Sequence, residues 1–145
     1  IGSGTYEPIR TLEINEHHMH QEHMDLSRDL CDRINRVKIN DGRVFAVGTT
    51  VLRALETVAR SRGAIKPFRG ETGLFIRPGF SFNLVDELFT NFHLPKSSLF
   101  VLVSAFAGLC RTHSAYQYAI RQRYRFCSYG DAMLVSKDRG ILSCG

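Results

Sequence analysis

The sequence lacks several features that would place it in a familiar class. It has no tryptophan, no low-complexity segment and no signal peptide. Its longest apolar run, residues 99–110, is too short to cross a bilayer. Its four cysteines form no CxxC pair and no spacing typical of a metal site, so we expect free thiols in a reducing compartment. These absences argue against a membrane protein and predict a cytoplasmic one.

The composition is that of an ordinary globular domain. The chain has 145 residues, of which 43% are hydrophobic and 23% charged, enough to bury a core. The formal net charge of +5 favours polyanionic partners, of which nucleic acid is the commonest. The sequence starts at Ile1 rather than Met, so we expect it to be a piece of a longer protein.

Helical and strand patterns alternate along the chain. Strands are expected at residues 43–47, 73–76 and 132–135, and helices at 27–39, 50–61, 84–89, 99–109 and 112–123, with a basic loop at 60–73. The first helix is expected to bury Leu30, Ile34 and Val37, and the second Val51, Leu55 and Val58. The alternation predicts an α/β fold, a layered domain with a mainly parallel sheet.

The most informative stretch is residues 90–98. It places an amide, an imidazole, an ammonium and two hydroxyls within a few residues: Asn91, His93, Lys96, Ser97 and Ser98. Either serine can cap the helix that follows, and the N–H groups at a helix start attract anions. The segment is therefore either a site mounted on a core helix or an ordinary polar loop.

A second candidate is Gly48-Thr49-Thr50, which comes directly after a predicted strand and opens a helix. Strand, Gly-Thr-Thr and helix is a geometry in which N–H groups and hydroxyls hold a phosphate or a carboxylate. A threonine N-cap explains the same residues. Arg53 and Glu56, three residues apart, either pair on the surface or point into a cleft.

Two further clusters carry alternatives. Four histidines lie between residues 17 and 23, where His and Glu suit zinc, but the spacing is not HExxH and a polar, substrate-facing segment is favoured. Arginines and tyrosines alternate at residues 121–129, as on nucleic-acid surfaces, or as a solvated helix flank.

Several runs together resemble one family. They are Glu16-His17-His18-Met19-His20, Ala46-Val47-Gly48-Thr49-Thr50, Arg53-Ala54-Leu55-Glu56, Pro78-Gly79-Phe80, the stretch from Thr90 to Ser97, Val103-Ser104-Ala105-Phe106-Ala107-Gly108, and Tyr124-Arg125-Phe126 with Ser128-Tyr129-Gly130-Asp131-Ala132-Met133-Leu134. In this order they resemble the C-terminal part of the S-adenosylmethionine:tRNA ribosyltransferase-isomerases of queuosine biosynthesis. The resemblance covers residues 1–136.

The resemblance implies that residues 1–136 are the C-terminal part of an α/β catalytic domain and that 137–145 are a tail. The family's N-terminal half and inserted β-barrel are missing. The implied reaction transfers the ribosyl part of S-adenosylmethionine, a co-substrate, to 7-aminomethyl-7-deazaguanine at the tRNA wobble position and isomerises it. Epoxyqueuosine-tRNA forms, and adenine and methionine are released. No metal, no nicotinamide and no membrane are implied, and the full-length enzyme is expected to be a monomer.

The chain departs from the family pattern at three places. Val51 and Leu52 stand where Ser and Val are expected, which removes one hydroxyl from the candidate anion loop. Cys127 stands where Phe is usual, and the tail after Val135 is unfamiliar.

The implied chemistry needs a base, an acid and binding groups. Residue chemistry makes His93, His18, His20 and Glu16 candidate bases, and Asp131 or a histidine the acid for departing adenine. An exposed Phe92 or Tyr129 would stack on the tRNA base, although core packing is favoured for Phe92. The methionine carboxylate is expected to bind to Gly48, Thr49, Thr50 and Lys96. The ribose hydroxyls are expected to bind to amide and carboxylate groups such as those of Asn91 and Glu56, and Arg53 is a further expected co-substrate ligand.

Three competing interpretations stay open. A metal-dependent hydrolase would bind zinc at the histidine cluster. A non-catalytic RNA-binding fragment would bind tRNA with a steep salt dependence and ignore S-adenosylmethionine. A folded but inactive chain is the third.

Overall fold

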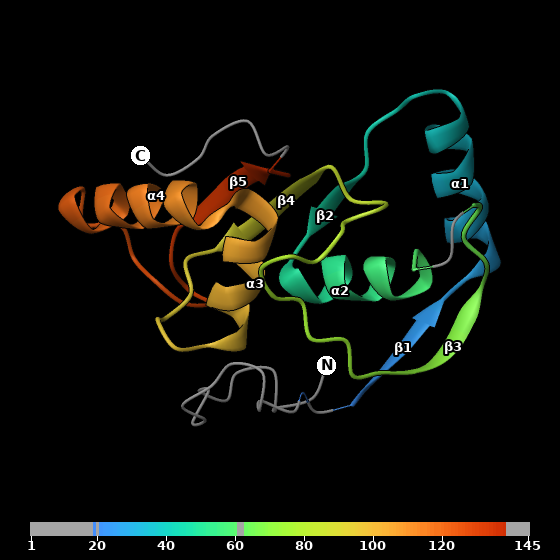
Figure 1. The fold of residues 1–145 in the computed structure, drawn as a ribbon, viewed down its shortest axis with the longest axis horizontal. Coiled ribbons are helices and arrows are strands. Elements are labelled where there is room, and N and C mark those ends of the chain that lie inside the picture. The colour runs from blue at the N-terminus through green and yellow to red at the C-terminus, as the bar shows by residue number, and fades with distance from the viewer. Residues whose placement is uncertain (1–18, 20, 61–62, 139–145) are drawn as a thin grey trace.

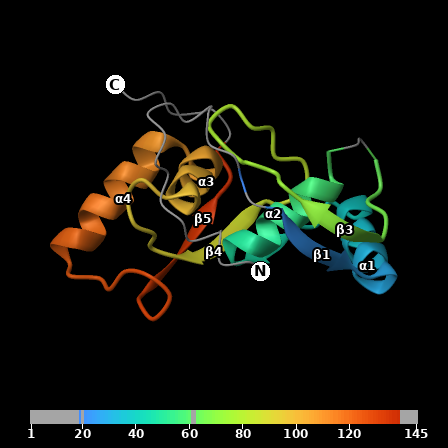
Figure 2. The same cartoon turned by 90° about the horizontal axis from the view of Figure 1, so that it is seen from below.

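A computed structural model describes residues 19, 21–60 and 63–138, which form a mixed α/β fold with two small sheets (Figure 1). Its elements, in chain order, are β1 (Glu22–Leu26), α1 (Arg28–Ile39), β2 (Phe45–Val47), α2 (Thr49–Val58), β3 (Phe68–Thr72), β4 (Glu87–Asn91), α3 (Ser98–Ala107), α4 (Leu109–Arg121) and β5 (Ala132–Ser136). Helix α1 lies at one end of the molecule and α4 at the other in both views (Figures 1 and 2).

The sheets correct the prediction of a mainly parallel arrangement. In the larger sheet, of order β2-β4-β5, β2 and β4 are parallel but β4 and β5 are antiparallel. The smaller sheet is the antiparallel pair β1-β3. The chain leaves β4 through two helices, α3 and α4, which are bent by 116° relative to each other. The two helices return the chain to the sheet so that β5 runs antiparallel to β4. A single crossover helix between these strands would have made them parallel.

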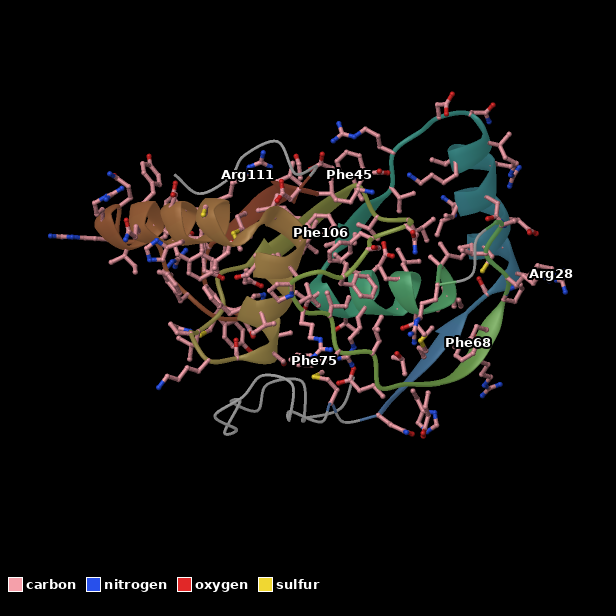
Figure 3. The ribbon with its side chains drawn as sticks, viewed as in Figure 1. Arg28, Phe45, Phe68, Phe75, Phe106 and Arg111 are labelled. Atoms are coloured by element: carbon pink, nitrogen blue, oxygen red, sulfur yellow. The ribbon has the colours of Figure 1, made fainter. Side chains whose placement is uncertain are left out.

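The core lies on one face of the larger sheet, under α2 and α3. Ala46 and Leu88 from the sheet pack with Leu52 from α2 and with Phe106 from α3, which is labelled near the centre of Figure 3. The opposite face is apolar yet exposed, at Phe45, Val47, Phe89 and Leu134. Strand β2 is therefore an edge strand with one buried residue rather than a fully buried one.

Several predicted elements are confirmed and others are wrong. Ser27 caps α1 by accepting a hydrogen bond from the N–H of Leu30 at 3.3 Å, as expected. The buried side chains of α1 are Cys31 and Ile34, whereas Leu30 and Val37 are more than a third exposed. Residues 73–76 are not a strand, since the strand lies at 68–72 within the predicted loop, and the helix expected at 84–89 is replaced by β4.

The burial of α2 also differs from the prediction. Its buried positions include Leu52, Arg53 and Glu56, and Val51 is 44% exposed. Two polar side chains of this helix are thus directed into the protein, where they replace part of the expected apolar face.

The apolar run after residue 97 is split at Gly108, whose φ of +87° ends α3 and starts α4. L-residues with a side chain avoid this conformation, which explains a glycine here. Among the described residues no single helix is long and apolar enough to span a membrane, and α3 with α4 reaches that length only as a bent pair.

Cys31 and Cys127 are free thiols, whereas Cys110 is disulfide-bonded, so the expectation of free thiols is wrong there.

Candidate functional site

A cavity of about 600 Å³ opens where β2 and β4 end. Its walls come from three distant segments, residues 47–51, 89–99 and 127–132. The carboxyl ends of neighbouring parallel strands are the usual place for ligands in α/β sheets, and this volume is in the range of small-molecule sites. Apolar side chains, Val47, Val51, Phe89, Leu94 and Leu99, line most of it.

The start of helix α2 forms one wall. Gly48, Thr49 and Thr50 line the cavity, as predicted for an anion loop. Gly48 has a φ of +94°, and its N–H donates to the Phe89 carbonyl at 2.8 Å, which fastens the loop to β4. No side chain caps the helix and its first turn holds no acidic residue. The first N–H groups of α2 consequently have no intrahelical acceptor, and this end carries a positive partial charge.

His93 also lines the cavity. Its Nε2 lies 2.9 Å from the Thr90 hydroxyl, and its backbone N–H donates to the Tyr116 hydroxyl at 2.9 Å. Burial lowers the pKa of His93 from 6.5 to about 4, so the imidazole is neutral at pH 7. A neutral imidazole can accept a proton or a hydrogen bond from a ligand in the cavity.

The contact between Tyr116 and His93 leads to a stability prediction. Replacing Tyr116 by Phe should lower the free energy of unfolding by about 1 kcal/mol, because the partly buried N–H of His93 loses its acceptor. Urea denaturation followed by circular dichroism measures this, and Tyr118→Phe is the matched control on the same helix, since Tyr118 is 52% exposed. Equal effects from both substitutions would refute the role of the Tyr116 hydroxyl.

Asn91 and Ser97 are in the cavity wall, as expected from the sequence. The Asn91 amide donates to the carbonyls of Gly130 and Asp131 at 3.4 and 3.3 Å, which holds the loop before β5 against β4. Ser97 caps α3 by accepting from Phe100 N–H at 3.1 Å and donates to the Leu94 carbonyl at 2.7 Å. Both residues therefore shape the cavity while also bordering it.

Asp131 does not fit the role of an acid. Its carboxylate accepts a hydrogen bond from the N–H of Arg125 at 2.7 Å and lies 3.5 Å from the Arg125 guanidinium. The backbone hydrogen bond and the guanidinium hold the pKa of Asp131 below its usual range. Its carboxylate is therefore ionised at neutral pH, and in this structure it fixes the loop at residues 125–131.

Arg53 and Glu56, expected as co-substrate ligands, are not among the residues that line the cavity. Arg53 is 4% exposed and forms a buried ion pair with Glu22. Glu56 is fully buried and accepts three backbone hydrogen bonds, from Asn83 at 2.9 Å, Leu84 at 3.1 Å and Val85 at 2.9 Å. Glu56 thereby fixes the segment that leads into β4, and both residues act on the fold.

The remaining candidates divide by position. Lys96 is exposed between two cavity-lining residues and adopts a left-handed φ of +60°. Phe92 is buried among Tyr116, Tyr124 and Phe126, so core packing is its role. Tyr129 is 99% exposed, next to the cavity-lining Ser128.

Glu16, His18 and His20 lie outside the described residues. Within the described ranges, 19, 21–60 and 63–138, no group of three or more His, Cys, Asp or Glu side chains could hold a metal ion. The residues proposed for zinc at 17–20 thus remain a prediction from the sequence.

Some cavity residues were not singled out from the sequence. Thr90, the partner of His93, and Ser128 appeared only as parts of motifs, and Cys127 only as a departure from the family pattern. The place of Thr90 and His93 in one polar motif, three residues apart, was the only signal for this pair. Residues 127–128 are held at the cavity by the Cys127 N–H, which donates to the Phe92 carbonyl at 2.9 Å, and by the pairing of β4 with β5, neither of which the sequence showed.

Comparisons with known proteins agree on one family. The model of the family described as "Queuosine biosynthesis protein" matches residues 1–135. An S-adenosylmethionine:tRNA ribosyltransferase-isomerase from Coxiella burnetii is 54% identical over 94% of this chain and 39% of its own length. The enzyme of the same name from Francisella philomiragia is 51% identical over 93% of this chain and 40% of its own length.

A solved structure supports the fold. The crystal structure of S-adenosylmethionine tRNA ribosyltransferase from Thermotoga maritima superimposes with a TM-score of 0.72 at 46% identity, over 76% of this chain and 38% of that one. This chain thus spans about two fifths of the length of the proteins it matches.

Proposed function

This chain belongs to the queuosine biosynthesis protein family, and we propose that it forms part of an S-adenosylmethionine-dependent tRNA ribosyltransferase-isomerase. The reaction joins the ribosyl part of S-adenosylmethionine to 7-aminomethyl-7-deazaguanine at the tRNA wobble position. Isomerisation of the sugar gives epoxyqueuosine-tRNA, with release of adenine and methionine. The relatives that carry this name are more than twice as long, so other segments contribute to the complete enzyme.

The observation that carries the proposal is the cavity between the start of α2 and His93. It combines an uncapped helix start, an apolar lining and a neutral imidazole. S-Adenosylmethionine needs the same three environments, for its carboxylate, its adenosyl group and its reacting centre.

The methionine carboxylate is assigned to the start of α2. The first N–H groups of the helix and the hydroxyls of Thr49 and Thr50 supply donors, and Gly48 lets the chain turn closely there. Lys96 supplies a positive charge from the loop between Leu94 and Ser97. The carbonyl oxygen of the Asn91 side chain, whose amide group is occupied by the loop, accepts from a ribose hydroxyl.

His93 is assigned as the general base. The amine of the deazaguanine nucleobase, which receives the ribosyl group, must lose a proton when its new bond forms. A neutral imidazole can accept that proton. The low pKa of His93 makes it a weaker base than a free imidazole and makes its protonated form a correspondingly stronger acid. It can pass that proton on to the departing adenine, the task for which Asp131 is unsuited.

The other features of the proposal come from the resemblance. Glu16 and His18 are further candidate bases from the segment outside the described residues. The enzyme is proposed to work in the cytoplasm, without a metal or a membrane, and as a monomer at full length.

Adenine release tests the proposal. This chain and a full-length relative are each incubated with S-adenosylmethionine and an anticodon stem-loop that carries the aminomethyl-deazaguanine base, and free adenine is measured by chromatography. Release by the full-length relative that depends on both substrates is the expected result, and release by this chain as well would place the essential groups within these residues. Release by the relative alone would mean that the chain needs the remaining segments, whereas saturable RNA binding that ignores S-adenosylmethionine would favour a non-catalytic RNA-binding fragment.

A further inference from the structure

The segment from α4 to the loop before β5 has an unusual charge and aromatic content. Residues 109–130 hold four arginines and four of the five tyrosines of the chain, and no aspartate or glutamate. Three of those tyrosines are exposed: Tyr118 by 52%, Tyr124 by 44% and Tyr129 by 99%. The segment therefore presents exposed aromatic rings beside arginines, of which Arg111 and Arg125 pair with Asp138 and Asp131.

The rings are held by the fold rather than scattered. Tyr118 and Tyr124 meet edge to face with their ring centroids 6.3 Å apart, and Tyr124 packs on the buried Phe92 at 5.9 Å. Tyr129 stands on a loop whose Gly130 cannot carry a side chain, since a Cβ would lie 2.3 Å from the Arg125 carbonyl oxygen. The neighbouring Ser128 lines the cavity, so Tyr129 stands beside the cavity wall, while Tyr118 and Tyr124 form a pair at the end of α4.

Positive charge accompanies the rings. Arg121 and Arg123 are exposed at the end of α4 and form no ion pair within the described part of the chain. Arg125 differs, because Asp131 compensates its charge. The two uncompensated guanidinium groups are available for phosphates.

We propose that Tyr118, Tyr124 and Tyr129, with Arg121 and Arg123, form a platform for an unpaired RNA strand and lead one of its bases to the cavity. Flat rings stack on unpaired bases of any sequence, and arginines neutralise the phosphates between them. Bases in a duplex are already stacked, so the platform selects a loop over a stem. This inference rests on the proposed function for the identity of the cavity, and it adds where the RNA lies.

Binding of a short RNA hairpin to this chain, followed by fluorescence anisotropy, tests the platform without any turnover. Tyr129→Ala should weaken binding about 5- to 100-fold, as expected for one lost stacking partner, and Tyr129→Phe should bind normally. A duplex of the same stem without unpaired nucleotides should bind weakly to all three proteins. Unchanged affinity of Tyr129→Ala for the hairpin, or equal affinity of the chain for hairpin and duplex, would overturn the proposal.

The arginines are tested through salt. Replacing Arg121 and Arg123 together by Gln should reduce the slope of log Kd against log salt by about 1.4, since each single-strand phosphate contact contributes about 0.7. The matched control replaces Arg33 and Arg36, which are exposed on α1 at the other end of the molecule, and removes the same charge. An equal change of slope in both double variants would show that net charge, not the platform, binds RNA. The RNA-binding assays contain no S-adenosylmethionine, so a negative result in them does not affect the adenine-release assay. A negative adenine-release assay likewise leaves RNA binding measurable, so the two proposals can fail separately.

Discussion

Replacing Glu56 by Gln is expected to lower the free energy of unfolding by about 3 kcal/mol or more, the largest effect of any single conservative change considered for this chain. The carboxylate is fully buried and accepts N–H groups from three successive residues, 83–85. A glutamine keeps one acceptor oxygen but turns an NH₂ group toward an N–H donor, which leaves both unsatisfied. Urea denaturation followed by circular dichroism measures the loss, since the chain has no tryptophan for fluorescence.

Glu71→Gln is the matched control for this prediction. Glu71 lies in β3 with a side chain 44% exposed and an ion pair to the exposed His23, so the same substitution should change the unfolding free energy by less than about 1 kcal/mol. A loss below about 1 kcal/mol for Glu56→Gln would show that the segment entering β4 does not depend on this carboxylate. A Glu56→Gln protein that cannot fold, beside a folded Glu71→Gln protein, would support the same dependence.

Replacing His93 by Ala is expected to reduce the rate of adenine release by about 100-fold or more. The neutral imidazole is the proton acceptor of the proposed reaction, and alanine offers none. Rates at saturating S-adenosylmethionine separate this effect from weaker binding. A loss below tenfold in a folded variant would remove His93 from the role of base and move attention to Glu16 and His18.

A measurement that needs no activity checks the environment of His93. Its folded pKa of about 4 lies below the ordinary 6.5, so the unfolded chain binds a proton more readily. The contribution of the neutral His93 side chain to the free energy of unfolding is therefore fully present above pH 6.5. Up to about 3 kcal/mol of it is lost as the pH falls to 4. The His93→Gln variant should lack this part of the acid destabilisation. Parallel pH profiles for both proteins would mean that the imidazole is not buried as described.

The sequence predicted which residues meet in the cavity better than it predicted the sheet that carries them. Gly48, Thr49, Thr50, Asn91, Ser97 and His93 do line one cavity, because a strand end and a capped helix start are local features that leave clear signals. Strand β4 left none. Residues 84–89 mix apolar and acidic side chains in a way that also suits a helix, and only the neighbours β2 and β5 decide that Leu88 points inward and Phe89 outward.

The burial of Arg53 and Glu56 could not be predicted for another reason. Charged residues three apart on a helix are usually solvated, and the sequence does not show that their partners, Glu22 and the backbone at 83–85, lie on distant segments. The contact between Asp131 and Arg125 is local by comparison and depends on the turn at Gly130. Residue patterns show neither the long-range partners nor the exact course of such a turn.

The cavity has walls from residues 47–51, 89–99 and 127–132, which has a consequence for the order of events during folding. No two of these segments are adjacent in the chain, and the bond from Gly48 to the Phe89 carbonyl closes a loop of about forty residues. Such closures are late and slow compared with helix formation. A chain that has made its helices but not yet paired β2 with β4 has no cavity, so the ability to bind a small molecule arises only with the completed sheet.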